Sequence, residues 1–228
     1  MLGDAEYKAE GARYNRRMNT RHNYGKALPT AAIVLAAMAA GLGLWLGTST
    51  FSPRAMRSAL LYPAPREIPA FQLSRADGGT LRQQDWRGKW NLVFFGFTHC
   101  PDVCPTALGV LKQVRANLVE AKLGDRVGMT FISVDPERDT PEQLKRYAAY
   151  FSPDLVAATG SDAELTALTR GLGLLYVRTP PAADGSYNVD HSASVVIVDP
   201  QGRMAGQFRP PLDAAALSAD LIVLAGKP

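Results

Sequence analysis

The chain has 228 residues, enough for one ordinary domain with an appendage and enough to bury a full core without disulfide staples. Its two cysteines are too few for a disulfide framework. The formal net charge of +4 is concentrated at the start, where residues 1–26 carry six Lys or Arg against three Asp or Glu. The remainder is close to neutral and has no basic stripe with interleaved aromatic residues, which excludes a nucleic-acid-binding domain.

No charged residue lies between Lys26 and Arg54, and residues 27–48 of this stretch are mainly apolar. A helix needs about 20 such residues to cross a bilayer. Because basic residues crowd the N-terminal flank, we expect residues 1–26 to stay in the cytoplasm and the remainder to be exported. The alternative is a cleaved signal peptide, but the apolar run exceeds the ~7–15 residues of a signal h-region. The pattern therefore favours an uncleaved transmembrane anchor.

Residues 49–69 are rich in proline and are predicted to form a linker, followed by a main domain over residues 70–228. The domain opens with a predicted hairpin, in which short apolar runs flank Asp77-Gly78-Gly79. Residues 91–97 are continuously apolar, as expected of a strand buried on both faces. Gly96 within this run indicates the close approach of another backbone.

A helix is predicted from the cysteines to about residue 122, and a strand over residues 127–134, so the two strands are expected to be parallel. Thr140 and Pro141 predict the start of the next helix, and the acidic residues before them are interpreted as loop and helix cap. Further along, helices are predicted over 162–171 and 214–224, strands over 174–177, 195–198 and 204–208, and a polar loop over 179–187. This alternation predicts an α/β domain of thioredoxin-like type.

The only cysteines, Cys100 and Cys104, lie at the junction of the predicted strand and helix. Amide groups in the first turn of a helix favour thiolate over thiol, which suits both metal binding and disulfide exchange. Three residues separate the two cysteines, one more than in the usual dithiol redox motif. The spacing suits two sulfurs that converge on one ion, although a disulfide between them stays geometrically conceivable.

Two thiolates make an incomplete metal site, and the chain offers three histidines as a third ligand. His22 lies on the other side of the predicted membrane. His99 adjoins Cys100, and neighbouring side chains of an extended segment point to opposite faces. His191, in a polar turn before the strand 195–198, is therefore the predicted third ligand. Two thiolates with an imidazole suit Cu(I) or Cu(II), and the absence of an obvious fourth ligand favours copper over zinc without excluding zinc.

Three blocks of the sequence together resemble the Sco/SenC family of copper chaperones, in order and in separation from about residue 60 to the C-terminus. The blocks are residues 97–105 (FTHCPDVCP), 133–141 (SVDPERDTP) and 189–192 (VDHS). The resemblance implies a thioredoxin-like fold with an added hairpin, and delivery of copper to the CuA site of cytochrome c oxidase during assembly.

The resemblance also implies that the metal ligands are Cys100, Cys104 and His191, with Asp102 and Asp135 in supporting positions beside them. The expected partners are the CuA subunit of the oxidase and other copper chaperones. Because the N-terminal segment does not look like a transit peptide, the expected location is a bacterial inner membrane, single-pass, with the C-terminal domain in the periplasm.

Two alternatives use the same residues. A thiol-disulfide oxidoreductase would cycle Cys100 and Cys104 as a redox-active pair between dithiol and disulfide bond. A copper or redox sensor would use the pair to signal to a partner. The residues do not decide whether the protein is an enzyme.

Overall fold

The computed structural model describes residues 30–51 and 56–226, and within the first range it describes the side chains of residues 32–42 only. The chain divides into two units, residues 1–53 and 54–228. The predicted cytoplasmic segment, residues 1–26, lies outside the described residues.

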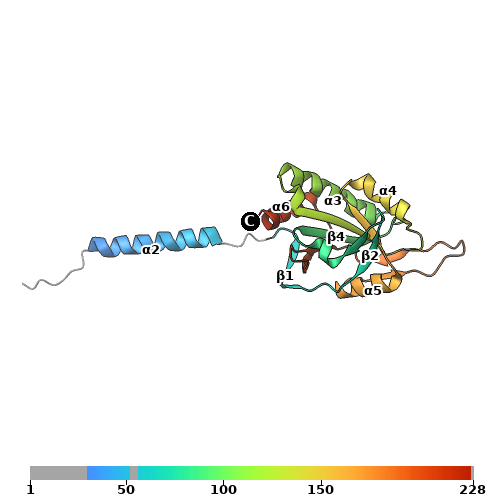
Figure 1. The fold of residues 1–228 in the computed structure, drawn as a ribbon. Helices are drawn as coiled ribbons and strands as arrows, with labels where there is room; N and C mark the ends of the chain where they lie inside the picture. The colour runs from blue at the N-terminus through green and yellow to red at the C-terminus, as the bar shows by residue number, and fades with distance from the viewer. Residues whose placement is uncertain (1–29, 52–55, 227–228) are drawn as a thin grey trace, which may run out of the picture. The chain divides into compact units, whose positions relative to one another are not determined.

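The first unit contains helix α2, Thr30–Phe51, a single helix of 22 residues (Figure 1). It overlaps most of the predicted anchor, residues 27–48, of which residues 27–29 lie outside the described part of the chain. Among the described residues, no helix is both long enough and apolar enough to cross a membrane.

An eight-stranded sheet forms the centre of the second unit, in the order β1-β10-β9-β4-β5-β6-β2-β3. Its strands are β1 (Ala59–Arg66), β2 (Gln72–Arg75), β3 (Thr80–Arg82), β4 (Trp90–Gly96), β5 (Val127–Ser133), β6 (Val156–Thr159), β9 (Val195–Val198) and β10 (Met204–Phe208). β5 pairs in parallel with β4 and β6, and the other neighbours are antiparallel. The predicted hairpins, β2 with β3 and β9 with β10, are confirmed.

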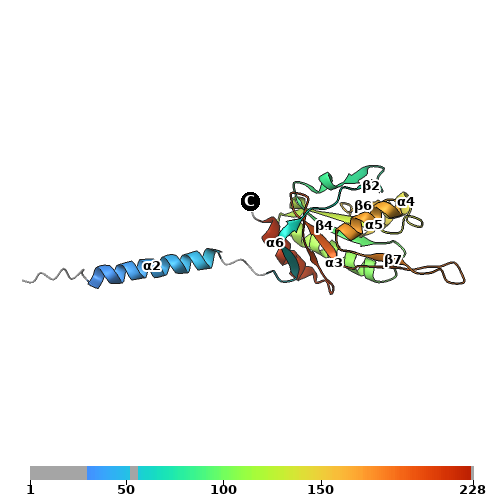
Figure 2. The ribbon, with the colours of Figure 1, turned by 90° about the horizontal axis from the view of Figure 1, so that it is seen from below.

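Helices cover both faces of this sheet, as expected of an α/β fold. They are α3 (Val103–Glu120), α4 (Pro141–Phe151), α5 (Asp162–Gly171) and α6 (Ala214–Ala225), with short 3₁₀ helices η1 (Gln83–Trp86) and η2 (Gly124–Arg126). Figure 1 shows α3, α4 and α6 on one face of the sheet and α5 on the other, and in Figure 2 α5 lies in front of the strands. α4 starts as predicted, because Thr140 Oγ1 accepts a hydrogen bond from the backbone N–H of Gln143 at 3.3 Å.

β4 is the strand on which the domain is built. Six of its seven residues are buried, because β5 and β9 flank it and helices lie over both faces. This burial explains its mainly apolar sequence. β4, α3 and β5 form the predicted parallel crossover, so the two cysteines lie at the end of a buried central strand.

The predicted linker is too long, because part of it, β1, pairs with β10 in the sheet. Pro63 and Pro65 have no N–H to donate, but β1 is an edge strand whose register is interrupted between Leu61 and Arg66, so the missing donors are tolerated. The start of β1 is held by Asp220 of α6, whose carboxylate accepts three hydrogen bonds from backbone N–H groups of residues 57–59, at 2.7 to 2.8 Å.

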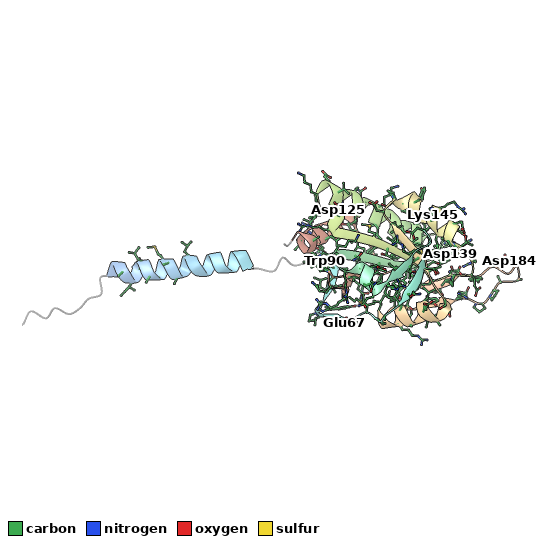
Figure 3. The ribbon with its side chains drawn as sticks, viewed as in Figure 1. Glu67, Trp90, Asp125, Asp139, Lys145 and Asp184 are labelled. Carbon is green, nitrogen blue, oxygen red and sulfur yellow. The ribbon has the colours of Figure 1, made fainter. Side chains whose placement is uncertain are left out.

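The predicted polar turn around His191 is a strand instead. β8 (Val189–His191) pairs antiparallel with β7 (Tyr176–Arg178) in a two-stranded sheet of its own. The sequence hides this strand because three residues are too few to show an alternating pattern. The loop that joins β7 to β8 projects from the domain in Figure 2, and Figure 3 places Asp184 at its outer end.

Candidate metal centre

Cys100 and Cys104 lie around the start of α3, directly after β4. Asp102 occupies the N-cap position of the helix, and Cys104 is its second residue. The backbone N–H of Cys104 points at the sulfur of Cys100, with 3.4 Å between N and Sγ. An amide of the first helical turn therefore faces the sulfur of Cys100.

His191 meets the cysteines from the end of β8. Its Nε2 atom lies 3.2 Å from Sγ of Cys104. The two sulfurs and one ring nitrogen of Cys100, Cys104 and His191 all lie within 4.8 Å of one another. The fold therefore brings the three predicted ligand residues together, and both cysteines are free thiols.

Burial shifts the pKa values of Cys104 and His191 in opposite directions, and both shifts favour the uncharged side chain. Cys104 is fully buried, and loss of solvation raises the pKa of its thiol far above the ordinary value. Burial also lowers the pKa of His191, which keeps the imidazole neutral. Nδ1 of His191 lies 3.3 Å from the backbone oxygen of Ser192. A proton on Nδ1 therefore leaves the lone pair of Nε2 free to bind a metal.

Aromatic residues of the central strand enclose the imidazole. Phe94 and Phe97 both meet it edge to face, with ring centroids 6.0 and 5.9 Å away. Gly96, between them, leaves room for the sulfur, because a Cβ at this position would lie 2.6 Å from Sγ of Cys104. The close approach that this glycine predicted is therefore real, but the approaching group is a side chain and not a backbone.

A cavity of about 260 Å³ opens beside Cys100 and His191. It is lined by Phe97, Pro101, Val103, Asn188, Val189 and Ala193 together with Cys100, Asp102, Asp190 and His191. Asp102 is exposed at its rim and accepts a hydrogen bond from Thr106 at 3.3 Å. Its predicted supporting role beside the ligands stays a prediction, and its carboxylate adds negative charge at the entrance.

Asp135, the second predicted supporting residue, is completely buried at the end of β5. Its carboxylate accepts from the hydroxyl of Tyr187 at 2.8 Å and from Nε of Arg138 at 2.5 Å. Sequence reasoning missed both partners. The only signal in the sequence is the position of Tyr187, four residues before His191.

His99 belongs to a different group, with Asp135 and Asp139, whose ligand atoms also lie within 4.8 Å of one another. Its Nδ1 atom lies 3.5 Å from Asp139, which agrees with its predicted exclusion from the thiol site. The carboxylate of Asp139 already accepts from Thr98 N, Thr98 Oγ1 and Ser133 Oγ, at 2.9, 2.6 and 2.5 Å. These bonds organise the loop, as the sequence indicated for the acidic residues.

The geometry supports two kinds of chemistry. Two thiolates and a neutral imidazole form a soft, three-donor set of the kind that copper takes in proteins. Within the described residues, no fourth His, Cys, Asp or Glu joins the group, so the set does not complete a usual structural zinc site. The same two sulfurs, both free and close together, can also form a disulfide.

Comparison with known proteins finds similar sequences and similar solved structures. The model of the family described as SCO1/SenC matches residues 62–225. A putative copper-binding protein of Stutzerimonas stutzeri is 36% identical over 157 residues, 68% of this chain and 75% of that protein. The mitochondrial SCO2 homolog of Bos taurus is 38% identical over 183 residues, 78% of this chain and 68% of that protein. Among solved structures, copper-bound ScoI of Bradyrhizobium japonicum is 36% identical, with a TM-score of 0.63 and coverage of 69% of this chain and 98% of that one.

Proposed function

The chain belongs to the SCO1/SenC family, and from this membership we propose that it is a copper chaperone that delivers copper to cytochrome c oxidase during assembly. Sco family proteins are copper-binding proteins involved in the assembly of that oxidase. In this proposal Cys100, Cys104 and His191 bind one copper ion, as Cu(I) or Cu(II). The acceptor is the CuA centre of the oxidase subunit, and other copper chaperones are candidate donors.

One observation carries the proposal: the ligand atoms of three residues converge within 4.8 Å. Burial of Cys104 and the neutral state of His191 support it, because an imidazole must be unprotonated to bind a metal. The copper-bound solved relative also supports it, because the structural match extends over 98% of that protein's chain.

Transfer follows from the unequal exposure of the two thiols. Cys100 is half-buried and lines the cavity, whereas Cys104 is fully buried behind it. An incoming acceptor thiolate therefore reaches the metal from the side of Cys100 and displaces that sulfur first. Cys104 and His191 hold the ion until the acceptor supplies further ligands. Each protein thiolate that leaves the metal takes up a proton and returns to the thiol form.

Copper titration of the full-length chain tests the assignment. We expect one copper ion per chain, and loss of this binding in Cys104→Ser. The loaded chain should then restore copper to an apo CuA domain, measured by the visible absorption of CuA, with the metal-free dithiol chain as the control. One-to-one binding that stays unchanged in Cys104→Ser would contradict the proposed ligand set.

We also propose that the chain is a single-pass protein of a bacterial inner membrane, with residues 1–26 in the cytoplasm, residues 27–48 as the anchor and the copper-binding domain in the periplasm. The absence of charge between Lys26 and Arg54 supports an anchor. As a helix, the 22-residue run 27–48 would be about 33 Å long, close to the ~30 Å of a bilayer core. Because β1 belongs to the sheet, the linker in this organisation ends near residue 58.

Membrane fractionation checks this topology. The chain should stay in the membrane pellet after alkaline carbonate extraction, and protease added to spheroplasts should reach the domain. Release of the chain by carbonate, or protection of the domain from protease, would contradict the proposed anchor or its orientation.

A second candidate function is reduction of the acceptor's own disulfide. It is favoured by two free thiols of unequal exposure, one accessible and one buried behind it. The Cys100 thiolate would attack the acceptor disulfide and release one acceptor thiol. Cys104 would then attack Cys100 and release the second, so the chain ends as a disulfide and the acceptor gains two electrons and two protons. His191→Ala separates the two functions, because it should abolish copper transfer and leave the reductase reaction largely intact.

A further inference from the structure

The loop between β7 and β8 is tied to the domain shortly before the histidine. The hydroxyl of Tyr187 donates to Oδ1 of Asp135 at 2.8 Å. Oδ2 of the same carboxylate accepts from Nε of Arg138 at 2.5 Å. Nη1 of Arg138 in turn donates to the backbone oxygen of Tyr187 at 2.9 Å. These three residues close a ring of hydrogen bonds, which we call the Tyr187 latch.

The domain side of the latch is rigid. Asp135 is completely buried, its backbone N–H donates to Ser133 Oγ at 3.1 Å, and its backbone oxygen accepts from Asp139 N at 3.0 Å. The loop side is held through the ring of Tyr187 as well, because the Arg138 guanidinium carbon lies 3.7 Å from the ring centroid. A hydrogen bond to a buried carboxylate is also stronger than one between neutral groups.

The latch is linked to the metal centre in two ways. Through the chain, Tyr187 is four residues from His191. Through space, the Arg138 guanidinium lies 5.6 Å from the ring of Phe97, and Phe97 packs edge to face on His191. The latch therefore sits directly behind the contacts that orient the imidazole.

The main sheet cannot hold His191 in place by itself, because β8 pairs with β7 alone, in a separate two-stranded sheet. The β7 side of this hairpin is attached by Tyr176 to Asp162 at 2.8 Å and by Arg178 to Glu137 at 2.5 Å. Glu137 is exposed, and so is Asp162. Of these three attachments, the latch is the one whose carboxylate is buried.

We propose, building on the copper-chaperone function above, that Tyr187 is a positioning residue for His191. With the latch closed, Nε2 of His191 lies within reach of Cys104 Sγ. With the latch open, β8 carries the imidazole away from the thiols, which releases one of the three ligands at the moment of transfer. Tyr187 does not itself contact the ligand atoms and acts through the hairpin.

Tyr187→Phe in the full-length chain tests the latch, because it removes the hydroxyl and keeps the ring that stacks on Arg138. In the metal-free chain we expect at least about tenfold faster exchange of the amide of Ser192, which donates to Leu175 O at 3.0 Å, and no change in β4 and β5. With copper, we expect an affinity for Cu(II) lower by about 10- to 100-fold, the effect typical of losing an outer-shell partner, and faster loss of copper to a chelator.

Ser186→Ala is the matched control. It changes the neighbouring residue and removes a hydrogen bond to Asp184 at 2.6 Å that lies within the loop, so exchange and affinity should match the wild type. Unchanged exchange or unchanged Cu(II) affinity in Tyr187→Phe overturns the latch, and leaves the chaperone function standing if the wild type binds copper. A wild type that binds no copper overturns the chaperone function, while the exchange rates still decide whether the latch holds the hairpin.

Discussion

Sγ of Cys104 lies 3.2 Å from Nε2 of His191, although the two residues are 87 positions apart in the chain. Cys104 belongs to the first turn of the helix that follows the central strand, and His191 ends a strand outside the main sheet. The contact therefore forms only when the β7–β8 hairpin is folded against the end of β4.

His191→Ala should weaken Cu(II) binding more than roughly 100-fold, because loss of a ligand exceeds the 10- to 100-fold cost of losing an outer-shell partner. Cu(I) binding should fall less, since the two thiolates remain. Competition titrations with a chromophoric chelator measure both affinities. His99→Ala is the control, because this residue is 44% exposed and faces Asp139. Equal effects of the two substitutions would show that His191 is not a ligand.

Gly96→Ala should destabilise the domain by about 1–3 kcal/mol, because the added Cβ would lie 2.6 Å from Cys104 Sγ and 3.0 Å from the Phe131 ring. It should also weaken copper binding, since the sulfur must move. Gly109→Ala, on the exposed face of α3 with nothing within 4 Å of the new Cβ, should stabilise by up to about 1 kcal/mol. Chemical denaturation compares the two variants. Similar effects would mean that Gly96 does not make room for the sulfur.

Copper affinity should rise with pH. Burial raises the pKa of the Cys104 thiol well above its ordinary value of 9.0, so the thiol is protonated at neutral pH in the metal-free chain. The ligand is the thiolate, so binding displaces this proton, and affinity gains about tenfold per pH unit for each proton released. His191 contributes no proton above neutrality, because burial lowers its pKa below 6.5.

Titrations from about pH 7 to about pH 8.5 measure this slope. An affinity independent of pH in the wild type would mean that Cys104 binds no metal as a thiolate.

Asp220→Ala should destabilise the domain by roughly 2–5 kcal/mol, because the backbone N–H groups of residues 57–59 lose their common acceptor. Asp213→Ala removes one N-cap hydrogen bond from the same helix and should cost about 1 kcal/mol. Denaturation midpoints and amide exchange at residues 57–59 give the comparison. If Asp220→Ala cost no more than Asp213→Ala, the carboxylate would not be what holds the start of β1.

Regular elements with strong local patterns could be predicted from the sequence. β9 and β10 match their predicted ranges, and α5 does as well, because apolar periodicity and turn residues define them locally. β1 and β8 could not be predicted in this way. β1 contains prolines that argue against a strand, and only its place at the edge of the sheet makes them harmless. β8 is held by its partner β7 and not by its own three residues.

The metal site likewise has features that could be predicted from the sequence and features that could not. The sequence by itself determined which residues can supply the chemistry, since only two cysteines and three histidines are present. Of the histidines, only His191 is neither beyond the predicted membrane nor adjacent to a cysteine. Only the tertiary structure decided that the sulfurs and the imidazole converge, that Cys104 is buried and that Tyr187 and Arg138 hold the hairpin through Asp135. The physical reason is that side-chain types are local properties of the chain, whereas distances and burial depend on how segments 87 residues apart pack together.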